Sequence, residues 1–137
     1  FVGGWSAGGH LTAMAARNPA FRGGFPISGI FDLEPIALSY LDEALKLDAA
    51  EIASLSPLRV LPEGMPPLRL FVGGGELAEL RRQSADYAAA ASARTLSVAL
   101  SELPGHNHFS ILDELSRPEG AITRALVDLI DATATRR

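Results

Sequence analysis

The first ten residues, FVGGWSAGGH, constrain the fold of this chain more than any other stretch, because they place a serine inside the pattern G-x-S-x-G. Residues 1–4 are apolar or small and are predicted to end a buried strand, and residues 7–17 have helical character. A serine at such a strand-to-helix turn is held in a strained backbone conformation that raises its hydroxyl above the sheet. Ser6 is therefore predicted to be a nucleophile.

The glycines around Ser6 have a steric explanation. Positions two before and two after the serine are expected to approach neighbouring backbone too closely for a side chain, which predicts Gly4 and Gly8 as required glycines. The helix that follows directs its N-terminus at the reacting carbonyl, so the backbone N–H of Ala7 is predicted to donate to an oxyanion. The alternative is a glycine-rich turn with a solvent-facing serine, and the position between a strand and a helix argues against it.

The rest of the chain alternates strands with helices. Further strands are predicted at residues 24–28, 68–72 and 95–103, and further helices at 79–93, 109–115 and 120–134. Such alternation predicts a parallel sheet with helices on both faces. Between the second and third strands, residues 34–56 are predicted to form two short helices, one of them begun by a capping box at Asp48–Glu51. Pro26 is unusual in a strand.

A serine nucleophile needs a base, and the base needs an acid that orients it. Where the serine lies in this kind of turn, the acid and then the histidine follow later in the chain, each just past a strand end. Glu76 is the first polar side chain after the strand and the three glycines at 73–75, so it is the predicted acid. Glu79, one helical turn further on, is the alternative, and Asp86 and Asp113 fit less well because they fall inside predicted helices.

Three histidines are candidates for the base. His10 follows Ser6 in the same helix and is expected to be a packed or solvated helix residue. His106 and His108 both lie in the loop after the last strand, where the base belongs, and their spacing prevents both from facing Ser6 in an extended loop. Phe109 is expected to anchor the end of this loop against the sheet, which favours His108 and leaves His106 as a solvated residue at the rim of the pocket.

Composition excludes several classes of function. The chain has no cysteine, which excludes disulfides, thiolate metal sites and a cysteine nucleophile. Its net charge of −4 provides no attraction to nucleic acid or anionic lipid, and no apolar run approaches the roughly 18 residues of a membrane span. We therefore expect no nucleic-acid or membrane partner. The absence of cysteine fits a cytoplasmic location.

Four stretches of the chain carry a resemblance to a known family. The chain resembles the C-terminal half of α/β-hydrolase-fold esterases in the stretches GGWSAGGHL, SGIFDLEPI, GGGELAELRRQSADYA and LPGHNHFSILDEL. More narrowly, it resembles the bacterial kynurenine formamidase (arylformamidase) group and its carboxylesterase-like relatives. The resemblance covers essentially the whole chain. It implies an α/β fold class with a parallel sheet, helices on both faces and a short helical lid insertion at about residues 30–56.

The resemblance also implies a site and an activity. It makes Ser6 the nucleophile, puts Glu76 at the position of the acid, where many relatives have aspartate, and puts His108 of the N-H-F pattern at the position of the base. The implied activity is that of a serine hydrolase cleaving a carboxylic ester or an N-formyl amide, with hydrolysis of N-formylkynurenine to kynurenine and formate as the first expectation. A general carboxylesterase is the alternative. No metal or cofactor is implied.

Enzymes of this family are longer than this chain. Their early strands, and the H-G-G loop that donates the second oxyanion N–H, precede the serine turn, and no stretch here matches them. Residues 1–137 are therefore expected to be a partial α/β-hydrolase domain that is inactive by itself. An inert remnant or an interaction module is the alternative from another class of function.

The expected partner is a small-molecule ester or amide, and a homodimer is left open. Candidate pocket residues are Trp5, Phe31 and His106. Phe31 and four apolar side chains of the insertion could line this pocket or could simply pack the two short helices on the sheet; the four are Leu38, Tyr40, Leu41 and Leu45.

Overall fold

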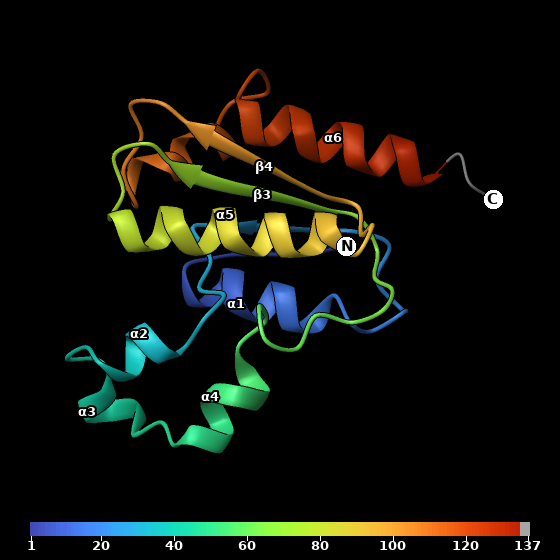
Figure 1. Ribbon diagram of the computed structural model, residues 1–137. Coiled ribbons are helices and arrows are strands. Elements are labelled where there is room, and N and C mark those ends of the chain that lie inside the picture. The colour runs from blue at the N-terminus through green and yellow to red at the C-terminus, as the bar shows by residue number, and fades with distance from the viewer. Residues whose placement is uncertain (135–137) are drawn as a thin grey trace.

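The computed structural model describes residues 1–134 and is built on a four-stranded parallel sheet (Figure 1). Its strands are β1 (Val2–Trp5), β2 (Gly24–Ile27), β3 (Leu68–Gly73) and β4 (Val98–Leu103), and they lie side by side in chain order. Each neighbouring pair is parallel. Apolar residues dominate β3 because a parallel strand covered on both faces is buried on both.

Helices cover both faces of the sheet, as predicted. One core joins β3 to α1 (Ala7–Ala15) and α5 (Ala78–Ala93), and the other joins β2 and β3 to the 3₁₀ helix η1 (Ser110–Leu115) and to α6 (Ala121–Ala134). Right-handed crossovers that all advance in one direction put α1 and α5 on the same face. In Figure 1, α6 lies on the opposite side of the strands from α1. The predicted fold class is confirmed.

Pro26 lies inside β2, between β1 and β3, although proline is usually confined to edge strands. The N–H groups on either side of it in the β2 ladder, those of Gly24 and Ser28, donate to the carbonyls of Pro67 and Phe71. Pro26 has no N–H to continue this alternation. The sheet therefore forgoes one ladder bond at this position and keeps the strand.

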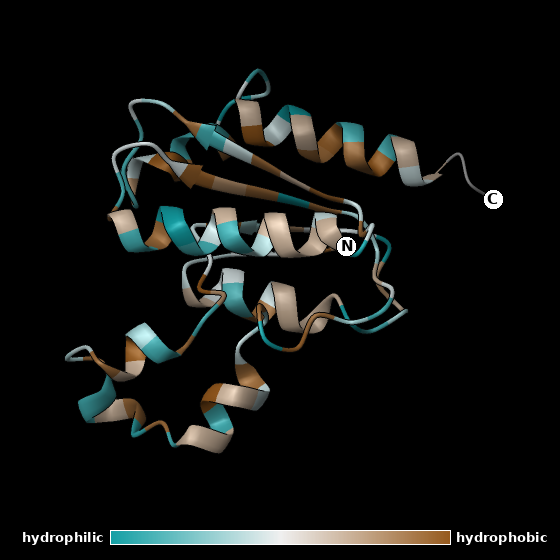
Figure 2. Ribbon diagram, in the orientation of Figure 1, coloured by the Kyte–Doolittle hydropathy of each residue, from teal (hydrophilic) through white to brown (hydrophobic). Residues whose placement is uncertain are grey.

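The insertion between β2 and β3 contains three short helices rather than the two predicted: α2 (Glu34–Ala37), α3 (Asp42–Leu45) and α4 (Ala49–Leu55). The capping box is present, because Asp48 accepts from the N–H of Glu51 and Glu51 accepts from the N–H of Asp48. The insertion projects away from the sheet on the side of α1 (Figure 1). Apolar residues are spread along the insertion (Figure 2). Several of their side chains are exposed, and that of Leu38 is 86% exposed.

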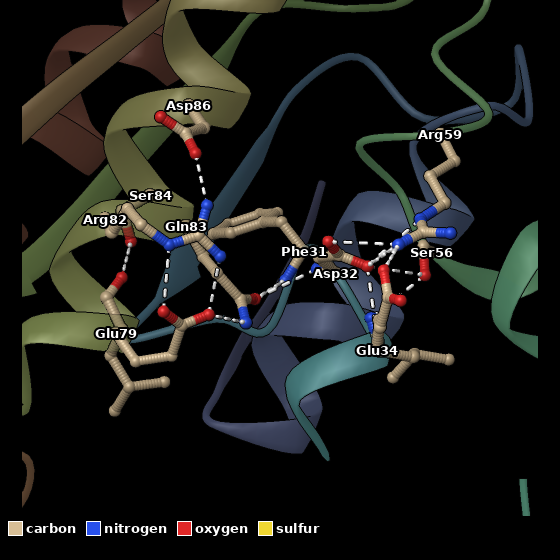
Figure 3. A network of polar contacts seen from close by, with 12 residues as sticks. Phe31, Asp32, Glu34, Ser56, Arg59, Glu79, Arg82, Gln83, Ser84 and Asp86 are labelled. Atoms are coloured by element: carbon tan, nitrogen blue, oxygen red, sulfur yellow. Dashed lines mark hydrogen bonds and ion pairs between the residues drawn. The ribbon is translucent and has the colours of Figure 1, made fainter. Parts of the chain in front are cut away.

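Both ends of the insertion are bonded together and to α5 (Figure 3). The buried side-chain oxygen of Gln83 accepts from the N–H groups of Phe31 and Asp32, and the carboxylate of Asp32 pairs with Arg59 beyond the last insertion helix. The hydroxyl of Ser56 accepts from the N–H of Leu33, which joins the start of the insertion to its end. The two ends of the insertion are thus held in place by hydrogen bonds and an ion pair. Among the described residues, no helix is long and apolar enough to cross a membrane.

Candidate active site

The carboxyl ends of the four parallel strands meet at one edge of the sheet, and each is followed by a polar side chain. Ser6 follows β1, Ser28 follows β2, Glu76 follows β3 and His108 follows β4. Sites in sheets of this kind are formed at this edge, beyond the carboxyl ends of the strands. The structure brings the three predicted residues together there, with Ser28 as a fourth that the sequence did not single out.

Ser6 has the strained backbone that its motif predicts. Its φ is 58° and its ψ is −117°, a conformation that residues with a side chain rarely adopt. Its N–H donates to the carbonyl of Ile27 in β2, and its own carbonyl accepts from the N–H groups of Gly9 and His10 in the first turn of α1. These bonds hold the turn from both sides. Because α1 begins at Ala7, the N–H of Ala7 has no partner within that helix.

The steric explanation for the flanking glycines is half correct. A Cβ on Gly4 would lie 2.5 Å from the carbonyl oxygen of Gly8, so Gly4 is required. A Cβ on Gly8 would meet nothing within 4 Å, so the prediction for Gly8 is wrong. The glycine that needs its close approach is Gly9, whose Cβ would lie 2.7 Å from the Cα of Gly29 beyond β2. Helix α1 therefore packs closely against β1 at Gly4 and against the residues that follow β2 at Gly9.

The two glycines of the motif should therefore respond oppositely to alanine. Gly4→Ala is expected to reduce the free energy of unfolding by about 1–3 kcal/mol, because the added methyl must displace backbone. Gly8→Ala is expected to raise it, by up to about 1 kcal/mol, because alanine is the better helix former and the space is open. Urea unfolding of the complete protein measures both. Equal destabilisation by the two substitutions would contradict this account.

His108 lies between Ser6 and Glu76. Its Nε2 is 3.1 Å from the Ser6 hydroxyl oxygen, and its Nδ1 is 2.8 Å from Oε2 of Glu76. An ionised carboxylate only accepts hydrogen bonds, so Nδ1 carries the proton and Nε2 is left to accept from Ser6. The side chain of His108 is 24% exposed, so one side of the imidazole is open.

The carboxylate of Glu76 is fully buried and has a partner at each oxygen. Oε2 accepts from His108, and Oε1 accepts from the N–H of Gly73 at 2.8 Å and from the hydroxyl of Ser28 at 2.5 Å. The alternative acid, Glu79, faces away from this site. It pairs with Arg82, whose side-chain hydrogen bond lowers the pKa of Glu79, and it accepts from Gln83.

Two backbone bonds connect the loop that carries the acid to the end of β4 and the loop that carries the base. Gly75 donates to the carbonyl of His106 at 2.9 Å, and Gly74 donates to the carbonyl of Leu103. Gly73 permits this approach, since a Cβ there would lie 2.4 Å from the carbonyl oxygen of His106. These contacts fix the separation between Glu76 and His108.

His106 is not the solvated residue that we expected. Its Nδ1 lies 3.0 Å from the carbonyl of Ser110 and its Nε2 lies 3.2 Å from Oε1 of Glu114. The N–H of Ala121 lowers the pKa of Glu114, helped by Arg117 and His106 and opposed by burial. His106 therefore ties the loop to the start of η1 and α6.

Trp5, which lies inside the serine motif, makes the contact nearest to the imidazole of His108. Its Nε1 donates to the carbonyl of His108 at 2.7 Å, and its ring lies 4.8 Å from the imidazole, centre to centre. Phe109, expected to anchor the loop, is instead 71% exposed, with its ring 5.7 Å from that of Trp5. Trp5 thus supplies the anchor that was assigned to Phe109.

Other predicted pocket residues lie elsewhere. Phe31 is 1% exposed and stacks on Tyr87 in the core, so its assignment to a pocket wall is wrong. Leu38, Tyr40, Leu41 and Leu45 are all exposed on the insertion. His10 bonds to the carbonyl of Leu55 at 2.8 Å and so joins α1 to α4, which agrees with a packing role.

Two surface cavities, of about 520 and 340 Å³, are lined by other residues and do not include the site. The larger one is at the opposite end of the strands, beside Pro67, Arg69 and Ser97. Within residues 1–134, no group of three or more His, Asp or Glu side chains is arranged to hold a metal ion.

Two curated proteins are similar to the chain over most of its length. A kynurenine formamidase from Danio rerio is 30% identical over 143 residues, and one from Salmo salar is 31% identical over 144 residues. Each match covers 95% of this chain and 49% of the relative, so the chain spans about half the length of these curated relatives. No family model matches the chain.

Solved structures of other proteins superpose on most of the chain. A protein from Silicibacter sp. tm1040, described as a candidate thioesterase, superposes with a TM-score of 0.78 and 25% identity over 89% of this chain and 48% of its own. Esterase B from Lactobacillus rhamnosis superposes with a TM-score of 0.74 and 19% identity over 98% of this chain and 53% of its own. The resemblance to α/β-hydrolase-fold esterases and kynurenine formamidases, predicted from the sequence, is confirmed.

Proposed function

We propose that the complete protein is a serine hydrolase that cleaves an N-formyl aryl amide or a carboxylic ester, with N-formylkynurenine as the first candidate substrate. One observation carries the proposal: Ser6, His108 and Glu76 come from three different strand ends and form one continuous set of hydrogen bonds. A nucleophile, a base in contact with it and an acid that orients the base are the parts that acyl transfer requires.

In the proposed reaction, the Ser6 hydroxyl oxygen attacks the carbonyl carbon of the substrate while Nε2 of His108 takes its proton. The negative charge that develops on the carbonyl oxygen is stabilised by the N–H of Ala7 at the start of α1. Glu76 holds the imidazole in the required tautomer and stabilises its charged form. The bond to the leaving group then breaks as His108 gives the proton to the departing amine or alcohol, which leaves an acyl group on Ser6.

The second half of the reaction releases the acid. His108 takes a proton from a water molecule, the resulting hydroxide attacks the acyl carbon, and the proton returns to Ser6 as the ester bond breaks. For an N-formyl amide the products are an amine and formate. For an ester they are an alcohol and a carboxylic acid.

The choice of an aryl substrate is supported by the two kynurenine formamidase relatives and by the side chains beside His108. The rings of Trp5 and Phe109 both lie next to the imidazole, at 4.8 and 5.5 Å. Phe109 is exposed and Trp5 is half-buried, and aromatic surface next to the reacting atoms suits an aromatic group on the substrate. A general carboxylesterase is the second candidate, favoured by the esterase names of several structural neighbours.

An organophosphonate probe is expected to label Ser6 of the complete protein and no other serine, because within residues 1–134 only the hydroxyl of Ser6 contacts an imidazole. Peptide mapping by mass spectrometry locates the adduct. The fully buried Ser28 and Ser110, the first residue of η1, are internal controls. An adduct on either of them, with Ser6 unmodified, would refute the assignment.

Formate release separates the two candidate substrates. The formamidase proposal expects turnover of N-formylkynurenine with one formate for each amine produced, and loss of that turnover in Ser6→Ala. Hydrolysis of short carboxylic esters without formate release from N-formylkynurenine would select the carboxylesterase. An absence of both activities in a protein whose Ser6 is unreactive would favour an interaction module.

A further inference from the structure

Ser28 is the polar residue at the end of β2, the strand that separates the nucleophile strand from the acid strand. Its side chain is fully buried, and its hydroxyl donates to Oε1 of Glu76 across 48 positions of sequence. Its backbone has a φ of 48°, in the region that favours glycine. A buried hydroxyl on a strained residue, 2.5 Å from a buried carboxylate, needs an explanation beyond packing.

The hydroxyl completes the set of donors around the acid. Glu76 has three partners, His108 on one oxygen and Gly73 with Ser28 on the other. Hydrogen bonds to a charged group are worth more than neutral ones, and an unmet charge in a buried site is costly. Without Ser28, Oε1 retains only the Gly73 N–H, and rotation of the carboxylate away from His108 becomes easier.

Backbone contacts hold the turn at Ser28 beside the strand that leads to the acid. Its N–H donates to the carbonyl of Phe71 in β3 at 2.7 Å, which ties the end of β2 to the strand that leads to the acid. The next residue, Gly29, is in close contact with Gly9 of α1. The turn at Ser28 thus lies between the turn that carries Ser6 and the loop that carries Glu76. The positive φ is the backbone strain that this position requires.

We propose that Ser28 is a positioning residue of the site, which holds the carboxylate of Glu76 in the orientation that His108 requires. The inference rests on the proposed function, since it assigns Ser28 to the same reaction. Ser28 does not touch the substrate in this proposal. It acts through Glu76, and removal of its hydroxyl should lower kcat without altering KM.

The test compares Ser28→Ala and Ser28→Gly with Ser84→Ala in the complete protein. Ser84 is the matched control, because it is also buried but donates only to the carbonyl of Leu80 within α5. Both Ser28 variants are expected to lose about 10- to 100-fold in kcat on a p-nitrophenyl ester, the loss expected for a hydrogen bond to a charged group, with KM unchanged. Ser84→Ala is expected to keep its kcat.

The contrast between alanine and glycine distinguishes positioning from folding. Glycine relieves the positive φ that alanine retains, so Ser28→Gly should melt at a higher temperature than Ser28→Ala while losing just as much kcat. If kcat instead followed stability and returned in Ser28→Gly, Ser28 would have a structural role only and the proposal would be wrong.

A spectroscopic readout makes the result independent of turnover. The proton between Nδ1 of His108 and Glu76 is expected to give a downfield ¹H NMR signal, identified by its loss in His108→Ala. This signal should move in Ser28→Ala and stay in Ser84→Ala. An unmoved signal with unchanged kcat would overturn the proposal. If Ser6→Ala retained turnover, the proposed function would fail, and the signal alone would decide the role of Ser28.

Discussion

Glu76→Gln is expected to lower kcat by about 10⁴-fold, the loss seen when the acid of a Ser-His-Asp triad becomes an amide. The amide oxygen of glutamine can replace only one carboxylate oxygen. If it stays with Gly73 and Ser28, which both donate to Oε1, the NH₂ group points at Nδ1 of His108. Nδ1 must then accept, so the proton moves to Nε2 and the base can no longer take one from Ser6. Steady-state kinetics on the complete protein measures the loss.

The matched control is Glu79→Gln, three residues along the chain. Glu79 is 41% exposed at its side chain and pairs with Arg82 at the surface of α5, so its charge is not used in the site. Its substitution is expected to change kcat by less than about threefold, as for a surface ion pair of small energy. A large loss in Glu79→Gln with a small one in Glu76→Gln would make Glu79 the acid and contradict the reading of the site.

The positions of Ser6, Glu76 and His108 could be predicted from the sequence because each follows a strand that the sequence defines clearly. Alternation of strands and helices predicts a parallel sheet, and a parallel sheet brings all its carboxyl ends to one edge. Local patterns were therefore sufficient to predict a long-range arrangement. The same reasoning applied to the second strand would have identified Ser28, which is the last residue of the strand predicted at residues 24–28 and comes directly after the observed β2.

Side-chain contacts between loops could not be predicted in the same way. Phe109 appeared to be the anchor of the base loop because it is apolar, yet the anchor is the indole N–H of Trp5, which reaches the carbonyl of His108. Phe31 appeared to be a pocket residue because it begins the insertion, yet Gln83 draws its backbone to α5 and its ring stacks on Tyr87. Both outcomes depend on elements far apart in sequence.

The glycines illustrate the same distinction. The pattern G-x-S-x-G predicts tight packing at both flanking positions, and the structure shows it at Gly4 and Gly9 rather than at Gly4 and Gly8. The contact of Gly9 is with Gly29 after β2, a partner that the motif itself does not contain. A motif therefore predicts the turn, while the neighbouring strand end determines which of its glycines are required.

The largest effect after that of Ser6 itself is expected from His108→Ala, which should remove acyl-enzyme formation and lower kcat by about 10⁴- to 10⁶-fold. The loss is expected to be chemical rather than structural. The Trp5 N–H bonds to the backbone carbonyl of His108, and Gly75 bonds to that of His106, so the loop retains both contacts in the variant. The melting temperature of His108→Ala should accordingly stay close to that of the unchanged protein.

His106→Ala is expected to behave in the opposite way. It removes the contacts of the imidazole with Glu114 and Ser110, which hold the loop to η1, but leaves the carbonyl of residue 106 bonded to Gly75. We expect a lower melting temperature and a change in kcat of less than about tenfold, because the base keeps its position. A burst assay with a p-nitrophenyl ester on the complete protein compares the two variants. A normal burst from His108→Ala, or a burst lost only in His106→Ala, would contradict the assignment of the base to His108.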